Sequence, residues 1–95
     1  MRKIEKAMVT ACVKNQNWHG DNTSVHYIPD IDGCEVYLHG HMIARTYRKP
    51  DRLHVDPVIE TFRNWPTNTT RSRLCALGVR ANIMKGRACI DGKEV

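Results

Sequence analysis

Apolar residues recur every three or four positions near the start of the chain, a spacing that places them on one face of a helix. The pattern extends over residues 3–15, and the polar run Asn15-Gln16-Asn17 weakens any continuation. It therefore predicts an amphipathic helix over residues 3–15. The apolar positions of this helix are Ile4, Ala7, Met8, Ala11 and Cys12.

Beyond this helix the apolar period falls to two, as expected for strands with one buried face. The segments concerned are residues 23–28, 34–38, 42–47 and 52–55. A turn at Gly40 joins the second and third segments into a hairpin, the clearest strand prediction in the chain. Cys34, Val36 and Leu38 share one side of the second segment. Pro57 ends the last segment or restricts it to a sheet edge.

A second helix is predicted after the loop of residues 64–68. Thr69 or Thr70 would cap its start and Gly78 would end it. In this helix we expect two leucines to face inward and two arginines outward. These residues are Leu74 and Leu77, and Arg71 and Arg73.

The remaining tail, residues 79–95, has turn residues at Gly86 and Gly92 and favours two short strands around Gly86. The order of elements predicts an α+β fold. We expect an antiparallel sheet of three to five strands with an N-terminal helix and a second helix near residues 69–77. No repeat or long linker divides the chain, so residues 1–95 are expected to form a single domain.

Composition narrows the class of protein without defining its activity. The 95 residues are 41% hydrophobic and 26% charged, which is typical of a small globular chain. No apolar run approaches the roughly 18 residues of a membrane span, and the N-terminus lacks the features of a signal peptide. We therefore expect no membrane partner. A chain this short also excludes a two-domain cofactor enzyme or a barrel enzyme.

Positive charge is concentrated in the second half. Lys and Arg total 15 against 10 Asp and Glu, which gives a net charge of +5. Residues 1–42 have four basic and five acidic side chains, whereas residues 43–95 have eleven and five. Such a field attracts anionic partners, of which nucleic acid is the commonest. The alternative is that the charge only keeps the protein dissolved.

Four cysteines, Cys12, Cys34, Cys75 and Cys89, could form two disulfides, but the missing signal peptide favours free thiols. No C-x-x-C motif supports a zinc site. The nearest metal-like cluster, Cys34 with His39 and His41, lacks a fourth ligand. We therefore expect buried structural cysteines and no metal or other cofactor.

Three segments could bind a partner. The predicted start of the second helix, residues 65–74, combines backbone N–H groups, hydroxyls and arginines that suit an anion, although ordinary capping uses the same geometry. His39 and His41 flank the hairpin turn and could bind metal, sense pH, contact a partner or remain idle. A basic strip with an aromatic residue inside it could contact phosphates and bases, or could protect an edge strand from aggregation. Its members are Arg45, Tyr47, Arg48, Lys49 and Arg52.

Catalytic motifs are absent. The sequence has no G-x-S-x-G, no glycine-rich phosphate loop and no H-E-x-x-H. His54 with Asp56 is too little for a metal-dependent nuclease, which needs converging carboxylates. We therefore expect a protein that is not an enzyme and has no catalytic residues, with a metal-dependent nuclease as the open alternative.

Several segments resemble small accessory proteins of short-tailed (podovirus-type) bacteriophages, and the likeness covers most of residues 1–77. They are residues 1–5, Asn22-Thr23-Ser24-Val25, Val36-Tyr37-Leu38-His39-Gly40, Ile43-Ala44, Trp65, Thr67 and residues 69–74. Cys75 departs from the pattern, and so does the tail after Gly78. The family is largely without an assigned activity, so the resemblance implies no particular activity. It implies only the context, that of a phage product acting in the host cytoplasm. The helix–strands–helix order is also analogous to that of double-stranded RNA-binding domains, but their Gly-Pro-x-His turn and lysine cluster are missing.

These observations favour a phage accessory protein that binds nucleic acid, DNA rather than RNA. The expected contacts are Arg45, Tyr47, Arg48, Lys49, Arg52, Trp65, Thr69, Thr70, Arg71 and Arg73. The alternative is a host-takeover inhibitor that docks on an acidic bacterial protein, such as a polymerase, nuclease or defence enzyme. Its anchors would be Trp65, Phe62 and Tyr37, because aromatic residues dominate interface energies. The sequence leaves the oligomeric state open.

Overall fold

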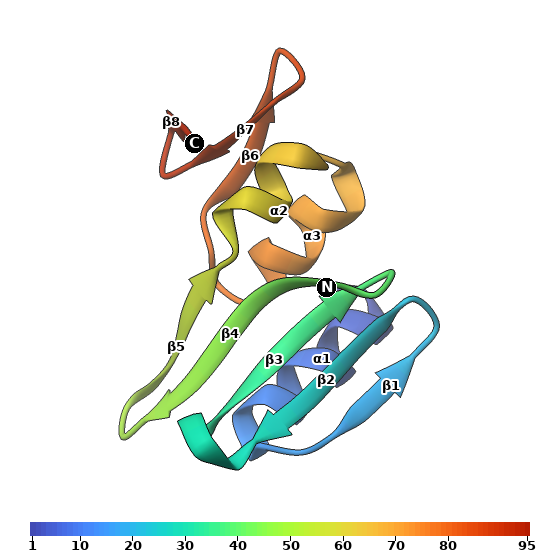
Figure 1. The fold of residues 1–95 in the computed structure, drawn as a ribbon, viewed down its shortest axis with the longest axis vertical. Coiled ribbons are helices and arrows are strands. Elements are labelled where there is room, and N and C mark those ends of the chain that lie inside the picture. The colour runs from blue at the N-terminus through green and yellow to red at the C-terminus, as the bar shows by residue number, and fades with distance from the viewer.

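The computed structural model describes residues 1–95 and shows an α+β fold with two antiparallel sheets (Figure 1). The first sheet has the order β1-β2-β3-β4-β5, so each strand pairs with its neighbour in sequence. Its strands are β1 (Trp18–Gly20), β2 (Thr23–Ile28), β3 (Gly33–Leu38), β4 (His41–Lys49) and β5 (Arg52–Pro57). A short 3-10 helix, Pro29–Ile31, links β2 to β3. The α+β class and the sheet of up to five strands are thus confirmed.

Three helices accompany this sheet: α1 (Lys3–Lys14), α2 (Ile59–Asn64) and α3 (Asn68–Ala76). A second sheet follows, with β6 (Ala81–Met84), β7 (Arg87–Ile90) and β8 (Lys93–Glu94). The predicted first helix and the strands flanking Gly86 are confirmed. None of the helices combines the length and apolar character needed to cross a bilayer.

The 3-10 helix and β8 were not predicted, and neither were β1 and α2. Strand β1 has three residues and ends in glycine, too short for an alternating pattern to show. Helix α2 has six residues and no side-chain cap, and only Phe62 in it is buried. Both elements are set by their neighbours in the fold and not by local sequence preference.

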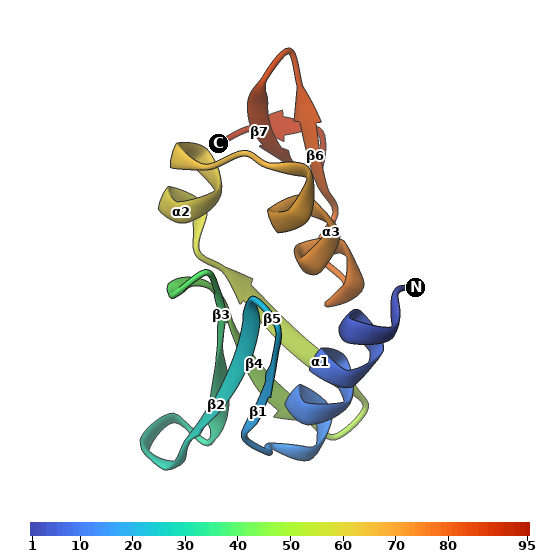
Figure 2. The same cartoon turned by 90° about the vertical axis from the view of Figure 1, so that its right-hand side faces the viewer.

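The two sides of the large sheet have different surroundings. Helices α1 and α3 cover one side, whereas no helix lies over the other (Figure 2). On the covered side, alternate strand residues and the inner faces of the helices form one buried cluster. It includes Met8, Cys12, Val25, Cys34, Val36, Phe62 and Leu74, all 0% exposed. Ala81 and Ala88 of the second sheet belong to the same cluster, so the tail shares this core.

A β-bulge in β4 explains a local break in the alternation. Val36 pairs with Ala44 and Tyr37 pairs with Met42, which leaves Ile43 without a partner on β3. This extra residue explains why Ile43 and Ala44 are both buried although they are adjacent in sequence. After the bulge the strand resumes with Arg45 exposed and Thr46 buried.

A buried ion pair connects the two helices on the covered side. Arg73 of α3 and Glu5 of α1 are each 4% exposed, and Arg73 Nη1 lies 2.8 Å from Glu5 Oε2. Ser72 Oγ donates a second hydrogen bond to the same oxygen, and Arg73 Nε donates to Thr23 Oγ1 of β2 at 3.1 Å. The expected outward orientation of Arg73 is therefore wrong. Its side chain reaches across to a carboxylate that is 68 positions away in sequence.

This ion pair makes stability depend on pH in a defined direction. Burial raises the pKa of Glu5, but the hydrogen bonds from Ser72 and Arg73 outweigh it, so the pKa lies below its ordinary value of 4.5. A lowered folded-state pKa stabilises the fold above the unfolded pKa, and this contribution is lost as pH falls through the folded pKa.

We expect Glu5→Gln to lower the free energy of unfolding at pH 7, because it leaves the buried Arg73 without a charge partner; breaking such a pair costs about 3–5 kcal/mol. The deficit relative to the unmodified chain should begin to shrink below the ordinary pKa of 4.5, which applies to the unfolded chain, and should shrink further as pH falls through the lowered folded-state pKa. Urea unfolding at a series of pH values measures both effects. Glu60→Gln, at an exposed carboxylate of α2 without an ion pair, is the matched control. An equal deficit at pH 7 and pH 3 would contradict this assignment.

Candidate nucleic-acid interface

The uncovered side of strands β2–β5, called here the open face, gathers polar and aromatic side chains from these four strands. Strand alternation and the cross-strand register assign its members. They are Ser24, His26, Glu35, Tyr37, Arg45, Tyr47, Lys49, Arg52, His54 and Asp56. Four of the ten residues expected to contact nucleic acid lie on this face: Arg45, Tyr47, Lys49 and Arg52.

Contacts in the middle of the open face hold its side chains in place. Tyr37 OH donates a hydrogen bond to Glu35 Oε1 at 3.0 Å, and Arg45 Nε lies 3.6 Å from Glu35 Oε2. His26 meets the Tyr37 ring edge-on, with ring centroids 5.3 Å apart. Burial, together with the hydrogen bond to Glu35, raises the pKa of Tyr37, so its hydroxyl remains protonated at neutral pH. Glu35 is thus engaged by two neighbours on the same face.

A second aromatic group lies toward the β4–β5 turn. The rings of Tyr47 and His54 are tilted by 34° with centroids 6.2 Å apart, and His54 Nε2 is 2.9 Å from Asp56 Oδ1. Gly33 makes this arrangement possible, since a Cβ there would lie 3.0 Å from Tyr47 Cδ1 and closer still to the Thr46 carbonyl oxygen. The Tyr47 ring therefore lies across β3 at a position that only glycine leaves open.

The cations nearest this turn have no carboxylate partner. Only three Lys or Arg side chains in the whole chain lie within ion-pair distance of an acid, and these are Arg45, Arg73 and Arg87. Arg48, Lys49 and Arg52 are exposed and unpaired. Strand alternation places Arg48 on the covered side, where it borders a shallow cavity beside Val13 of α1. The sheet end thus presents positive charge toward both sides.

The basic strip is mostly not at a sheet edge. Arg45, Arg48 and Lys49 lie on β4, which is paired on both sides, and only Arg52 lies on the edge strand β5. Protection against edge aggregation is therefore a role open to Arg52 alone.

The other expected contacts lie away from the open face. Thr69 and Arg73 line a cavity with Arg2, Lys3 and other residues between α1 and α3. Trp65 and Thr70 line a separate cavity of about 240 Å³ under α2 and α3. Arg71 is half-buried on α3, and both Thr70 and Arg73 are 4% exposed. The structure does not bring the ten residues together on one surface.

The start of α3 is capped by a residue other than those expected. Thr67 is the N-cap, and its Oγ1 accepts a hydrogen bond from the Thr70 N–H at 3.2 Å. Thr70 Oγ1 lies 3.0 Å from the same hydroxyl. The prediction of Thr69 or Thr70 as the cap is wrong by two or three positions. It failed because Thr67, Thr69 and Thr70 are equivalent in sequence and only the backbone geometry separates them.

Two further residues differ from expectation. Phe62 is 0% exposed and belongs to the core cluster, so the prediction that it anchors a protein partner is wrong. Cys75, expected to be buried, is exposed. The other three cysteines are buried, and burial raises the pKa of Cys12 to about 12.

The histidines of the β3–β4 hairpin have distinct environments. His41 stacks on Trp65 with ring centroids 4.7 Å apart and planes 26° from parallel, whereas His39 is exposed at the turn. No group of three or more His, Cys, Asp or Glu side chains in the chain could hold a metal ion. The sheet register places Cys34 near the opposite end of β3 from these histidines.

Together these features define a small α+β protein whose large sheet has one helix-covered side and one open side with cations and aromatic rings. The sequence model of the Kyanoviridae Gp96 protein family matches residues 1–94, and the chain therefore belongs to this family of phage proteins. No curated protein and no solved structure matches the chain. The expected phage origin is confirmed. The expected link to short-tailed phages is corrected, because Kyanoviridae are cyanophage myoviruses and not podoviruses.

We expect Thr67→Ala to lower the free energy of unfolding by about 1 kcal/mol, since the Thr70 N–H loses its side-chain acceptor. Thr69→Ala, two positions along the same helix, should change it by no more than about 0.5 kcal/mol. Urea denaturation of the two variants, each compared with the unmodified chain, measures the difference. A larger loss for Thr69→Ala would show that the helix begins at the position suggested by sequence.

Proposed function

We propose that this phage protein binds single-stranded nucleic acid, DNA in particular, on the open face of its large sheet, in the host cytoplasm. The observation that carries the proposal is the combination of Tyr37 and Tyr47 with Arg45, Lys49 and Arg52 on a sheet face that no helix covers. Tyrosine rings provide stacking surfaces for bases, and the cations provide contacts for the phosphates between them.

The shape of the site favours a single strand over a duplex. The two tyrosines lie within the sheet surface, where a base must be unpaired to stack on them. A double-stranded RNA-binding mode would instead need cations at the start of α3. Arg73 in that helix is already neutralised by Glu5, and Arg71 is half-buried.

The charge balance of the open face also supports an anionic partner. Its two carboxylates are already engaged, Glu35 with Arg45 and Tyr37 and Asp56 with His54. Lys49 and Arg52 have no such partner, so their charge is available to phosphates. Neutralising phosphates releases counterions from the nucleic acid, so the affinity should fall steeply with salt.

Fluorescence anisotropy with a labelled oligothymidylate of about 12 nucleotides tests this proposal. We expect binding at low salt and a logarithmic salt slope reduced by about 1.4 in Arg45→Ala/Lys49→Ala, because two single-strand phosphate contacts of about 0.7 each are lost. Arg63→Ala/Lys93→Ala is the matched control, since it removes the same two residue types at exposed, unpaired positions on α2 and β8.

Two results would overturn the proposal. One is the absence of binding to single-stranded DNA or RNA at low salt. The other is a control variant that loses as much affinity and salt slope as the open-face variant, which would show that only net charge matters.

A further inference from the structure

The outer edge of β5 has unpaired backbone groups. Strand β5 is the last strand of the large sheet and pairs only with β4. Val58 N–H donates to the Ile43 carbonyl oxygen at 2.8 Å, in register with the Ala44–Pro57 pair. In an antiparallel ladder, hydrogen-bonded and non-hydrogen-bonded pairs alternate. Arg52, His54 and Asp56 therefore direct their backbone groups toward β4. Leu53 and Val55 direct theirs away from it.

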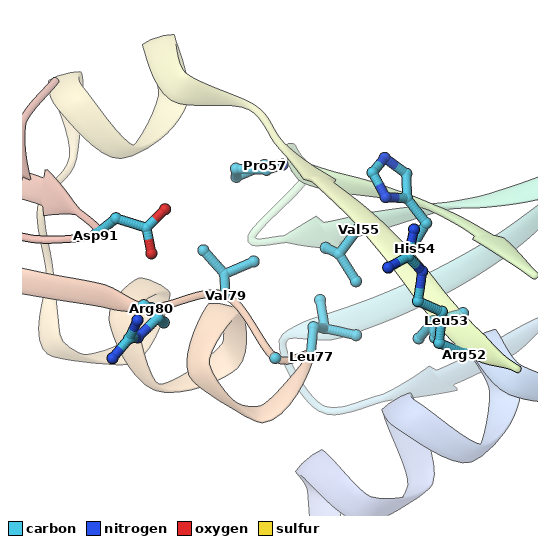
Figure 3. A pocket seen from close by; sticks show the side chains of 10 residues that line it. Arg52, Leu53, His54, Val55, Pro57, Leu77, Val79, Arg80 and Asp91 are labelled. Atoms are coloured by element: carbon cyan, nitrogen blue, oxygen red, sulfur yellow. The ribbon is translucent and has the colours of Figure 1, made fainter. Parts of the chain in front are cut away.

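The outward groups border a cavity of about 480 Å³ between β5 and the segment that links α3 to β6 (Figure 3). Leu53 and Val55 point into it toward Leu77, and Val79 extends into it from the linking segment, whereas His54 lies on the opposite side of the strand. No backbone hydrogen bond connects residues 52–57 to any segment other than β4. An unpaired strand edge beside a cavity that is lined in part by apolar residues can accept another strand.

We propose that this edge pairs with the same edge of a second copy of the chain, through an antiparallel β5–β5 contact with His54 on the twofold axis. In this register Leu53 of each copy lies opposite Val55 of the other. Because both residues direct N–H and C=O outward, the two pairs form four backbone hydrogen bonds. In each copy, the Leu53 and Val55 side chains lie on the side of the sheet where the cavity is. In the dimer they therefore also border the cavity of the other copy.

Charge selects this occupant and this register. The same alignment places Arg52 of each copy opposite Asp56 of the other, and Arg52 has no ion pair within its own chain. Centring the contact on Val55 would place Leu53 opposite Pro57, which has no N–H to donate. Centring it on Leu53 would place Val55 opposite Asp51, outside the strand. Arg52 and Asp56 discourage pairing with unrelated strands, but in this register each lies opposite the oppositely charged residue of the second copy.

Pairing would join two large sheets into one of ten strands, with both open faces on the same side. The dimer does not require nucleic acid, and its partner is defined by the chain itself. In the dimer Arg52 is paired with Asp56 of the other copy, so Arg45 and Lys49 are the open-face cations that remain for phosphates. The contact is small, so we expect an equilibrium between monomer and dimer that depends on concentration.

Sedimentation equilibrium on nuclease-treated protein tests the dimer directly. We expect Arg52→Asp and Asp56→Arg each to weaken dimerisation by about tenfold, since each places like charges opposite one another twice. The double variant Arg52→Asp/Asp56→Arg exchanges the charges and should recover the original dimer affinity. Lys6→Glu, an exposed and unpaired position on α1, is the control for charge reversal and should have no effect.

Val55→Pro provides a second route, because the N–H that it removes faces outward and makes no bond within the chain. We expect this variant to keep the circular dichroism of the unmodified chain and to be monomeric. A monomer at every concentration of the unmodified chain would overturn the proposal, as would a double variant that fails to recover the dimer. If the β5 edge instead pairs with an extended segment of another protein, the unmodified chain would be a monomer at every concentration.

Discussion

The buried ion pair between Glu5 and Arg73 holds α1 and α3 together on the same side of the large sheet. It joins α1 to α3, and Arg73 also donates to Thr23 of β2, so two helices and a strand meet at one guanidinium. Replacing a buried ion pair by apolar residues is often neutral for stability. The contribution of this pair is therefore one of geometry, because an unpaired charge in any other arrangement of the helices would be costly.

The open face follows from this arrangement. With α1 and α3 held on one side, the other side of β2–β5 remains free of helices (Figure 2). The same pair also removes Arg73 from the surface charge of the second half of the chain. The positive charge that remains near the sheet is concentrated at the β4–β5 turn, where Arg48, Lys49 and Arg52 have no acidic partner.

Sequence periodicity predicted the elements that are long enough to repeat a pattern. Helix α1 and strands β2–β5 were found from their apolar spacing, and the basic strip on β4 and β5 supplied four residues of the open face. Sequence periodicity could not show that Arg73 is buried, because its partner Glu5 lies in the first helix. An arginine in a helix of mostly polar residues is expected to face solvent. Periodicity also could not show the bulge at Ile43, which depends on pairing with β3. Helix α2 and strand β1 are short, and tertiary contacts decide their structure.

The helix-free side of the sheet is the proposed binding surface. Titration of the isotopically labelled protein with an unlabelled oligothymidylate of about 10 nucleotides, followed by NMR amide shifts, tests it most directly. We expect shifts concentrated on β3, β4 and β5, with Tyr37, Arg45 and Tyr47 among the most affected and α1 and β6–β8 unchanged. Shifts concentrated on α1 and α3, or no shifts at low salt, would contradict it.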